Sequence, residues 1–355
     1  MCSLKKGVKE MKVLVTGGAG LVGSHCAEYF AKKNYQVTIL DNLLRSKIFG
    51  SDIETVEYNW KYLSRYKNIK RIKGDIRNEK DVLKAIGSGV DAVIHTAGQP
   101  GVPSSVRDPK DDFSINAFGT LNVLECLRQK SKKAAFVYCS TNKVYGENVD
   151  KIPLKELKKR YTYSGVEGVD ESMLTDLTGH TPYGVSKLVG DLYTQEYAHI
   201  YGMRTCVFRM SCIYGIRQFG FEDQGWVAWF IIAALLNKPI VIYGDGKQVR
   251  DLLYAEDLVR AYEAFIDSSL KSGLFNIGGG AENTTSLLEF LDKIYGILGK
   301  KPKYSFKDWR PSDQKVYITN TAKVKKVLNW YPRVNVEEGI TRLCAWVKDN
   351  QKMFK

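Results

Sequence analysis

The stretch MKVLVTGGAGLVG, residues 11–23, decides the fold of this chain. Its first six residues are mostly apolar and β-branched, as is typical of a strand buried on both faces of a sheet. Gly17, Gly20 and Gly23 follow, and a helical pattern continues over residues 24–33. Glycine permits a tight turn and lets backbone amides approach a pyrophosphate, while the helix N-terminus favours its negative charge. The order of strand, glycine turn and helix therefore predicts a dinucleotide site.

A second strand, residues 36–40, ends at Asp41, which lies 18 residues after Gly23. A carboxylate at this place can accept hydrogen bonds from the hydroxyls of the adenosine ribose, and it would repel a 2′-phosphate. Asp41 therefore favours NAD over NADP as the cofactor. Arg45 follows closely and could accommodate a 2′-phosphate, but we interpret it as a solvated loop residue.

Further apolar strands are predicted over residues 69–73, 92–95 and 135–139, each followed by a helical pattern. This alternation predicts an α/β fold with a doubly wound parallel sheet, whose ligand lies at the carboxyl ends of the strands. His95 ends an apolar strand and is interpreted as a core histidine. The polar residues at the strand ends are predicted to face one crevice, and they are Asp41, Asp75, Thr96, Ala97, Gly98, Gln99, Ser140 and Thr141.

The stretch TPYGVSK, residues 181–187, carries the candidate chemistry. Tyr183 and Lys187 are four residues apart, so they share one face of a helix. A nearby ammonium favours the ionised phenol, so we expect it to lower the pKa of Tyr183 toward working pH. Such a phenol can exchange a proton with a substrate hydroxyl. Alone, this spacing is also common on ordinary amphipathic helices, and it gains weight only beside a cofactor that takes a hydride.

Composition describes an ordinary globular protein of 355 residues, with 44% hydrophobic and 26% charged residues. The seven cysteines include no C-x-x-C pair and the four histidines are dispersed, so neither a metal site nor a disulfide framework is expected. The longest apolar run, residues 226–236, is too short to cross a bilayer and predicts a buried helix. Residues 1–10 contain lysines without an apolar segment behind them, so we expect a short disordered extension and a cytoplasmic protein without a membrane partner.

The formal net charge of +14 has two interpretations. It can indicate an anionic partner, either a nucleic acid or a diphosphate ligand, or it can reflect a lysine-rich solvated surface. The densest basic cluster, residues 151–160, is short and interrupted by apolar residues. No nucleic-acid-binding motif is present, so a nucleic-acid partner is not expected.

Taken together, these motifs resemble the extended short-chain dehydrogenase/reductase family of NAD-dependent nucleotide-sugar epimerases and dehydratases. The matches occur in the family's order and span the chain from Met11 onward. They are TGGAGLVG at 16–23, Asp41-Asn42, Gly74-Asp75-Ile76, HTAG at 95–98, NAFGT at 116–120, Ser140-Thr141-x-x-Val-Tyr-Gly at 140–146, and Tyr183-x-x-x-Lys187.

The resemblance implies a Rossmann-type NAD-binding domain over residues 11–212, to which residues 251–282 return. It further implies a smaller α/β domain over residues 213–355 that mainly binds the substrate, and a homo-oligomer. The residues implied to bind NAD are Gly17, Gly20, Leu21, Val22, Gly23, Asp41, Asn42, Asp75, Ile76, Thr96, Ala97, Gly98, Gln99, Asn116, Ser140, Tyr183 and Lys187.

The catalytic set implied by the resemblance is Thr141, Tyr183 and Lys187. Thr141 would hydrogen-bond the reacting hydroxyl, Tyr183 would exchange its proton, and Lys187 would stabilise the tyrosinate and hold the nicotinamide ribose. Because side chains cannot take a hydride, NAD would do so. The candidate substrate-binding residues are Thr141, Tyr183, Gln224, Arg250 and Arg310. The resemblance implies that both arginines grip a diphosphate, although by residue type alone they could equally form salt bridges to Asp251 and Asp313. Gln224 could bond a pyrimidine edge or be an ordinary surface glutamine.

Within the family, the chain is similar to epimerases that invert C2 of CDP-linked 3,6-dideoxyhexoses. The stretches that carry this closer similarity are residues 140–146, 170–172, 217–219, 223–227, 244–251 and 312–314. Family dehydratases place an Asp-Glu pair directly after the threonine, whereas this chain has Asn142 and Lys143, which disfavours elimination of water. The alternatives are a UDP-hexose 4-epimerase and, outside enzymes, an NAD-sensing binding module or a basic nucleic-acid binder.

Overall fold

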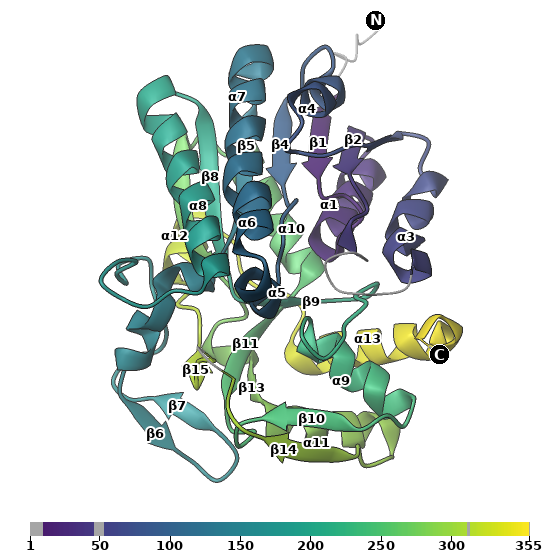
Figure 1. Ribbon diagram of the computed structural model, residues 1–355, viewed down its shortest axis with the longest axis vertical. Helices are drawn as coiled ribbons and strands as arrows, with labels where there is room; N and C mark the ends of the chain where they lie inside the picture. Colours follow the sequence, from purple (N-terminus) through teal and green to yellow (C-terminus); the bar gives the residue numbers. More distant parts are fainter. Residues whose placement is uncertain (1–9, 46–52, 311–312, 355) are drawn as a thin grey trace, which may run out of the picture.

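The computed structural model of the protein describes residues 10–45, 53–310 and 313–354 (Figure 1). The expected disordered extension lies outside the described residues, except for Glu10. Ser312, which belongs to one of the stretches quoted above, also lies outside them.

A parallel sheet of seven strands forms the upper part of the molecule in Figure 1, counted over the described residues. Its spatial order is β12-β8-β5-β4-β1-β2-β3, so the order reverses between β1 and β4. Such a reversal opens a crevice at the carboxyl ends of the strands. The predicted doubly wound sheet is confirmed, and its strands are β1 (Lys12–Thr16), β2 (Gln36–Asp41), β3 (Ile69–Lys73), β4 (Ala92–His95), β5 (Ala135–Thr141), β8 (Arg204–Met210) and β12 (Ser272–Ile277).

Helices cover both faces of this sheet, because successive strand residues point to opposite faces and both sets are apolar. Val13 and Val15 pack into one core, whereas Leu14 between them packs into the other. The first core includes residues of α1 (Leu21–Lys32), α10 (Ala255–Asp267) and α12 (Ala322–Leu328), with α3 (Ile53–Tyr62) against α1. The second core includes residues of α4 (Glu79–Ile86), α7 (Gly119–Ser131) and α8 (Pro182–Tyr201).

A second unit lies below the carboxyl ends of the sheet (Figure 1). Its core packs residues of α9 (Trp226–Leu235), α11 (Leu287–Leu298) and α13 (Val336–Asp349). The buried helix predicted over 226–236 is therefore confirmed. The strands here are β9 (Cys212–Tyr214), β11 (Val249–Tyr254), β13 (Thr284–Ser286) and β15 (Val316–Tyr317), the pair β10 (Ile240–Tyr243) and β14 (Tyr304–Lys307), and the hairpin β6 (Leu154–Glu156) and β7 (Tyr161–Tyr163).

The chain returns to the first sheet later than residue 251. β12 pairs with β8 in parallel from Ser272 opposite Thr205 onward, so the late strand does return. Residues 251–254, by contrast, belong to β11, which pairs with β9 and β13. These residues stay with the second unit because Leu252 and Tyr254 both pack in its core. No helix among the described residues combines the length and apolar character needed to cross a membrane.

Candidate active site

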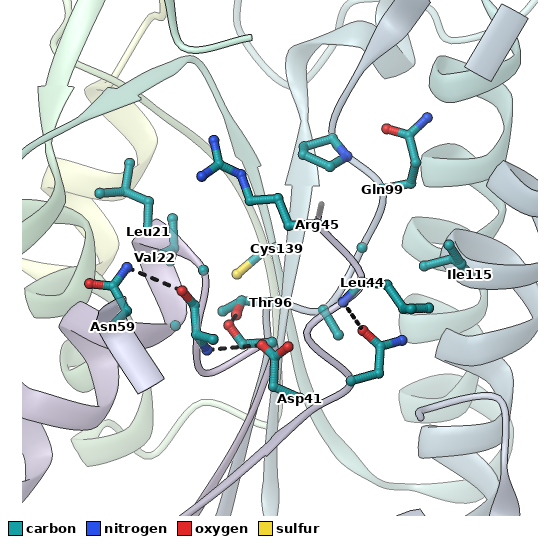
Figure 2. A pocket seen from close by; sticks show the side chains of 18 of the residues that line it. Leu21, Val22, Asp41, Leu44, Arg45, Asn59, Thr96, Gln99, Ile115 and Cys139 are labelled. Atoms are coloured by element: carbon teal, nitrogen blue, oxygen red, sulfur yellow. Dashed lines mark hydrogen bonds between the residues drawn. The ribbon is translucent and has the colours of Figure 1, made fainter. Parts of the chain in front are cut away.

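A cavity of about 350 Å³ lies at the carboxyl ends of the central strands (Figure 2). Most of the predicted site residues line it: Gly17, Gly20, Leu21, Val22, Gly23, Asp41, Asn42, Ile76, Thr96, Ala97, Gly98, Gln99, Tyr183, Lys187 and Gln224. The other predicted residues are not part of its lining, and these are Asp75, Asn116, Ser140, Thr141, Arg250 and Arg310.

The glycine turn has no room for side chains. A Cβ atom on Gly17, whose φ is +70°, would lie 2.6 Å from the backbone nitrogen of Ala97. One on Gly23 would lie 2.1 Å from the carbonyl oxygen of Gly17. Gly20 is the N-cap of α1, and the first turn of that helix contains no acidic residue. The turn therefore presents bare backbone and a positive helix end to the cavity, which fits the pyrophosphate of a dinucleotide.

The carboxylate of Asp41 is held at the end of β2 by two backbone amides. Its Oδ2 accepts a hydrogen bond from the nitrogen of Ala19 at 2.9 Å, and its Oδ1 accepts one from the nitrogen of Leu43 at 2.8 Å. Burial raises the pKa of Asp41, although these hydrogen bonds oppose the shift. Since a carboxylate oxygen can accept more than one hydrogen bond, both oxygens keep capacity for ribose hydroxyls.

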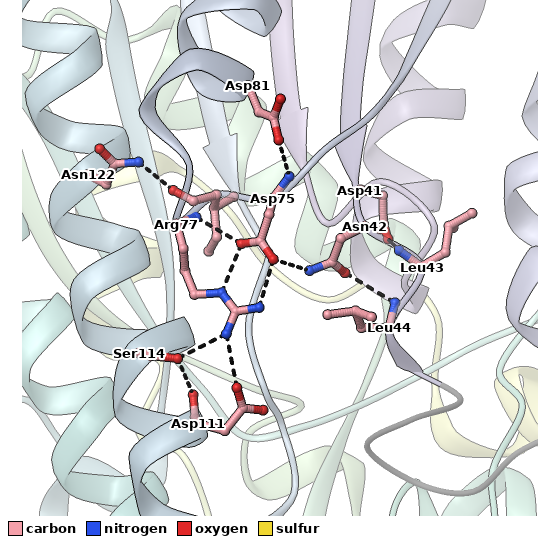
Figure 3. Close-up of polar contacts among 11 residues, drawn as sticks. Asp41, Asn42, Leu43, Leu44, Asp75, Arg77, Asp81, Asp111, Ser114 and Asn122 are labelled. Carbon is pink, nitrogen blue, oxygen red and sulfur yellow. Dashed lines mark hydrogen bonds and ion pairs between the residues drawn. The ribbon is translucent and has the colours of Figure 1, made fainter.

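Asp75 is not part of the cavity lining, and Figure 3 shows the polar contacts that hold it. Arg77 donates to both of its oxygens from Nε and a terminal nitrogen, at 3.0 and 2.7 Å, and also from its backbone at 2.9 Å. Asn42 donates a fourth hydrogen bond at 3.0 Å. Burial raises the pKa of Asp75, but the Arg77 hydrogen bonds outweigh it and lower the pKa. With its acceptor sites used, Asp75 positions Asn42 and its neighbour Ile76, which do line the cavity.

Asn116 supports the cavity wall from behind, whereas Ser140 belongs to a buried polar contact away from it. Asn116 lies in a π-helical turn, Ser114–Phe118 (η2). Its amide accepts from the backbone nitrogen of Gln99 at 2.8 Å and donates to the Gln99 carbonyl at 3.0 Å, which fixes the backbone of that lining residue. Ser140 donates to buried Asp191 at 2.7 Å. His95 bonds Thr16 and Thr120 through its two ring nitrogens, so it is the core histidine that the sequence predicted.

Helix α8 places the predicted catalytic pair. Its N-cap, Thr181, accepts a hydrogen bond from the nitrogen of Gly184 at 3.2 Å, so the helix begins one residue before Tyr183. Tyr183 and Lys187 lie one turn apart, and both line the cavity. Burial lowers the pKa of Lys187 to about 8. The ammonium lies 4.3 Å from the ring centroid of Tyr138.

The predicted lowering of the Tyr183 pKa is wrong for this structure. Burial raises the pKa of Tyr183 to about 12, because the phenolate loses its hydration. A hydrogen bond with the side chain of Thr141 acts in the opposite direction. Thr141 ends β5 and also accepts from the nitrogen of Lys143 at 3.3 Å as a cap. The structure thus brings Thr141, which lies behind the lining, into contact with Tyr183, which lines the cavity.

The two predicted diphosphate-binding arginines lie outside the cavity and are paired with carboxylates. Arg250 contacts Asp313 at 2.7 Å, and Arg310 contacts Asp223 at 2.8 Å. Arg310 and Asp313 line a second, open cleft of about 560 Å³ together with residues that precede α8. Gln224, by contrast, lines the first cavity.

Several lining residues have no counterpart in the sequence-based prediction. Met210 is the last residue of β8 and Ser211 follows it, so the rule that ligands lie at strand ends would have found both. Asn59 on α3, and Arg45 and Arg217 in loops, also line the cavity. No motif marks Asn59, because its position depends on how α3 packs.

Comparison with known proteins agrees with this geometry. The model of the NAD dependent epimerase/dehydratase family matches residues 13–278. The CDP-paratose 2-epimerase of Salmonella typhi is 39% identical over 345 residues, which cover 95% of this chain and 99% of that protein. The UDP-glucuronate 4-epimerase of Thermodesulfobacterium geofontis is 31% identical over 344 residues, which cover 96% of this chain and 98% of that protein.

A solved structure has the same fold. The UDP-glucuronic acid 4-epimerase of Bacillus cereus, in complex with UDP-glucuronic acid and NAD, superposes with a TM-score of 0.80 at 27% identity. The match covers 96% of this chain and all of that one. The resemblance, the fold and the cofactor expected from the sequence are thereby confirmed. The chain belongs to the NAD dependent epimerase/dehydratase family, and it is an NAD-dependent epimerase of the extended short-chain dehydrogenase/reductase type.

Proposed function

We propose that this enzyme inverts C2 of a CDP-linked 3,6-dideoxyhexose and converts CDP-paratose to CDP-tyvelose. The observation that carries the chemistry is the contact between Thr141 and Tyr183 at one end of a dinucleotide cavity that Lys187 also lines. The choice of sugar is supported by the 39% identity with the CDP-paratose 2-epimerase of Salmonella typhi along nearly the full length of both chains.

The residues of the cavity fit NAD. The bare glycine turn would take the pyrophosphate, and Asp41 would hold the adenosine ribose. Oxidised NAD would accept a hydride, and the positive charge of its ring would favour the Tyr183 phenolate, which burial alone disfavours. Lys187 would bond the nicotinamide ribose through an ammonium that is already partly dehydrated.

Tyr183 would exchange the proton of the C2 hydroxyl while Thr141 holds that hydroxyl in place. The phenol and the threonine hydroxyl are the groups that reach a sugar carbon together, because they are in contact at the ends of α8 and β5. After oxidation, the keto-sugar would turn its other face before the proton and hydride return. The net change is an inversion without net oxidation, so the cofactor need not leave.

One feature supports an epimerase over a dehydratase, and another supports a nucleotide-sugar substrate. Asn142 and Lys143 supply no carboxylate pair after Thr141. Arg250 and Arg310 would exchange their carboxylate partners for the oxygens of a diphosphate, which guanidinium groups bind in pairs. We propose that residues 213–355, outside the returning strand, mainly bind this part of the substrate.

A second candidate is C4 inversion of a UDP-hexose. The observation that favours it is the 31% identity with the UDP-glucuronate 4-epimerase of Thermodesulfobacterium geofontis. Inversion at C4 would use the same proton and hydride transfers at a different carbon. Hydroxyl stereochemistry is read by the shape of the pocket, so a panel of sugars separates the two.

The direct test is NMR of purified enzyme incubated with CDP-paratose, UDP-glucose or UDP-glucuronic acid without added NAD. The expected result is inversion at C2 of the CDP-sugar only, with Tyr183→Phe as the inactive control. Conversion of a UDP-sugar alone would replace the first candidate by the second. Conversion of none would remove both substrate assignments.

We further propose that the enzyme is a homodimer in the cytoplasm. α6 (Pro109–Phe113), η2 and α8 contact one another, and they expose Phe113, Phe118, Val185 and Leu192. Such a patch on one face favours association. The six cysteines of the described chain are free thiols, which supports a reducing compartment.

A further inference from the structure

The segment Arg217–Gln224, called the clasp segment below, borders the dinucleotide cavity although it follows β9 of the second unit. Arg217, Gln218, Phe219 and Gln224 all line the cavity that the glycine turn and Asp41 also line. The proposed chemistry uses none of these four side chains. Their contacts with the first unit show what they do instead.

Arg45 joins the ribose end of the cavity to the middle and the C-terminal end of this segment. It lies four residues after Asp41, and its guanidinium donates to the carbonyl oxygen of Phe219. It also donates to Oε1 of Gln224 at 3.3 Å and lies 5.7 Å from the ring centroid of Phe221. Burial lowers the pKa of Arg45 to about 10, so it remains charged at neutral pH. The loop arginine of the sequence is therefore a link between the two units, and Figure 2 shows it extending across the cavity.

Arg217 anchors the other end of the clasp segment. Its side chain is 2% exposed, contacts Glu28 of α1 at 2.7 Å and lies 4.3 Å from the ring centroid of Tyr62. Glu28 also accepts hydrogen bonds from Tyr62 and Tyr66, at 2.7 and 2.8 Å. Arg217 has a φ of +62°, which is uncommon for a residue with a side chain. The surrounding ion pair and ring contact hold it in that conformation.

Asn59 ties the clasp segment directly to the glycine turn. Its side chain is 3% exposed. Its Nδ2 donates to the carbonyl oxygen of Ala19 in the turn at 3.1 Å (Figure 2) and to that of Arg217 at 3.5 Å. Phe219 adds apolar contacts with Tyr58 of α3 and Trp346 of α13. The polar contacts of Arg45, Arg217 and Asn59, together with this aromatic cluster, therefore hold the clasp segment against the part of the cavity next to Asp41.

We propose that Arg45 and Arg217 are positioning residues that hold the clasp segment over the adenosine half of NAD and so retain the cofactor through successive turnovers. The inference deepens the proposed function, because an enzyme that oxidises and then reduces the same sugar has no use for cofactor exchange. NAD could leave only after the contacts of Arg45 with Phe219 and Gln224 break. Gln224 then belongs to this closure rather than to a pyrimidine site.

The test measures cofactor release and needs no sugar, so it stands apart from the substrate assignment. Protein loaded with NADH is mixed with excess NAD, and the loss of bound-NADH fluorescence gives the release rate. Arg45→Ala and the double variant Arg45→Ala/Gln224→Ala are expected to release NADH about tenfold faster or more, because a charge-assisted hydrogen bond to the segment is lost. Arg45→Lys, which can still donate to the Phe219 carbonyl, is expected to restore much of the retention.

Arg342→Ala is the matched control, because Arg342 is an ion-paired arginine on α13 that does not line the cavity. Its release rate is expected to equal that of the wild type. Added NAD is further expected to raise the turnover of Arg45→Ala and to leave that of the wild type unchanged. Equal release rates for Arg45→Ala, the double variant and the wild type, with equal thermal unfolding of the NAD-free proteins, would overturn the proposal.

Discussion

Replacing Lys187 by methionine is expected to stabilise the NAD-free protein at neutral pH. The same substitution is expected to abolish the turnover of the NAD-loaded enzyme. The side chain of Lys187 is 6% exposed, and its ammonium lies over the ring of Tyr138. An ammonium loses most of its hydration at such a place, whereas the thioether of methionine loses little. Methionine also fills a similar volume, so the packing of the stem is largely kept.

The magnitude follows from the pKa. Burial lowers the pKa of Lys187 from 10.5 to about 8, which corresponds to about 3 kcal/mol of destabilisation at neutral pH, at about 1.4 kcal/mol for each pKa unit. The folded-state pKa lies below the unfolded one, so the unfolded chain binds this proton more tightly. The penalty is therefore complete below about pH 8, shrinks as the pH rises from 8 to 10.5, and vanishes above that.

Urea unfolding of NAD-free wild type and Lys187→Met, at pH 7 and at pH 10, measures both quantities. We expect the variant to be more stable by about 1–3 kcal/mol at pH 7, with a smaller difference at pH 10. Other groups that titrate in this range are common to both proteins and cancel in the comparison. Lys348→Met, at an exposed lysine of α13, is the control and should show no such pH dependence. A variant that is less stable at pH 7, or a difference independent of pH, would refute the reasoning.

Four further outcomes are expected. Tyr183→Phe should lower turnover by about 10²–10⁴-fold, because the proton-exchanging group is lost, while absorbance shows NAD still bound. Asp41→Ala should weaken NAD binding and reduce its preference over NADP in calorimetric titrations, because the ribose acceptor and its negative charge are removed. Asp191→Asn should lower the free energy of unfolding by about 3–5 kcal/mol, because the guanidinium of Arg209, now 2.9 Å from Asp191, would stay buried without a counter-charge. Leu192→Glu should convert the proposed dimer to a monomer in light scattering, and a monomeric wild type would contradict the assigned interface.

The central strands of the first sheet could be predicted because β1, β4 and β5 are buried on both faces and are largely continuous apolar runs. β3 matches the predicted bounds, and β1, β2 and β5 differ from them by one or two residues at one end. The glycine turn was predictable for a different reason: Gly17 and Gly23 lie where a Cβ would meet backbone atoms. Because only glycine fits at these positions, the glycine spacing is visible in the sequence. The strand, the turn and Asp41 could therefore be predicted as one dinucleotide site.

The clasp segment could not be predicted, because its contacts join residues far apart in the chain. Arg217 and Glu28 are separated by nearly the whole first unit, and neither residue type indicates a buried ion pair by itself. Arg45 was interpreted as solvated for the same reason, since a loop arginine acquires a partner only when Phe219 is brought beside it. Tertiary packing, rather than propensity, decides these positions.

The wrong sign for the Tyr183 pKa has the same origin and explains how the site works. The spacing of Tyr183 and Lys187 on α8 gave the correct geometry, but burial disfavours the charged form of each, raising one pKa to about 12 and lowering the other to about 8. At neutral pH the buried phenol of Tyr183 is therefore held neutral, whereas Lys187 stays charged although burial disfavours its ammonium. A bound cofactor that brings a positive ring and ribose hydroxyls supplies the interactions that each group lacks. In the proposed mechanism, cofactor binding and proton exchange then both depend on the burial that disfavours the ammonium of Lys187 in the NAD-free protein.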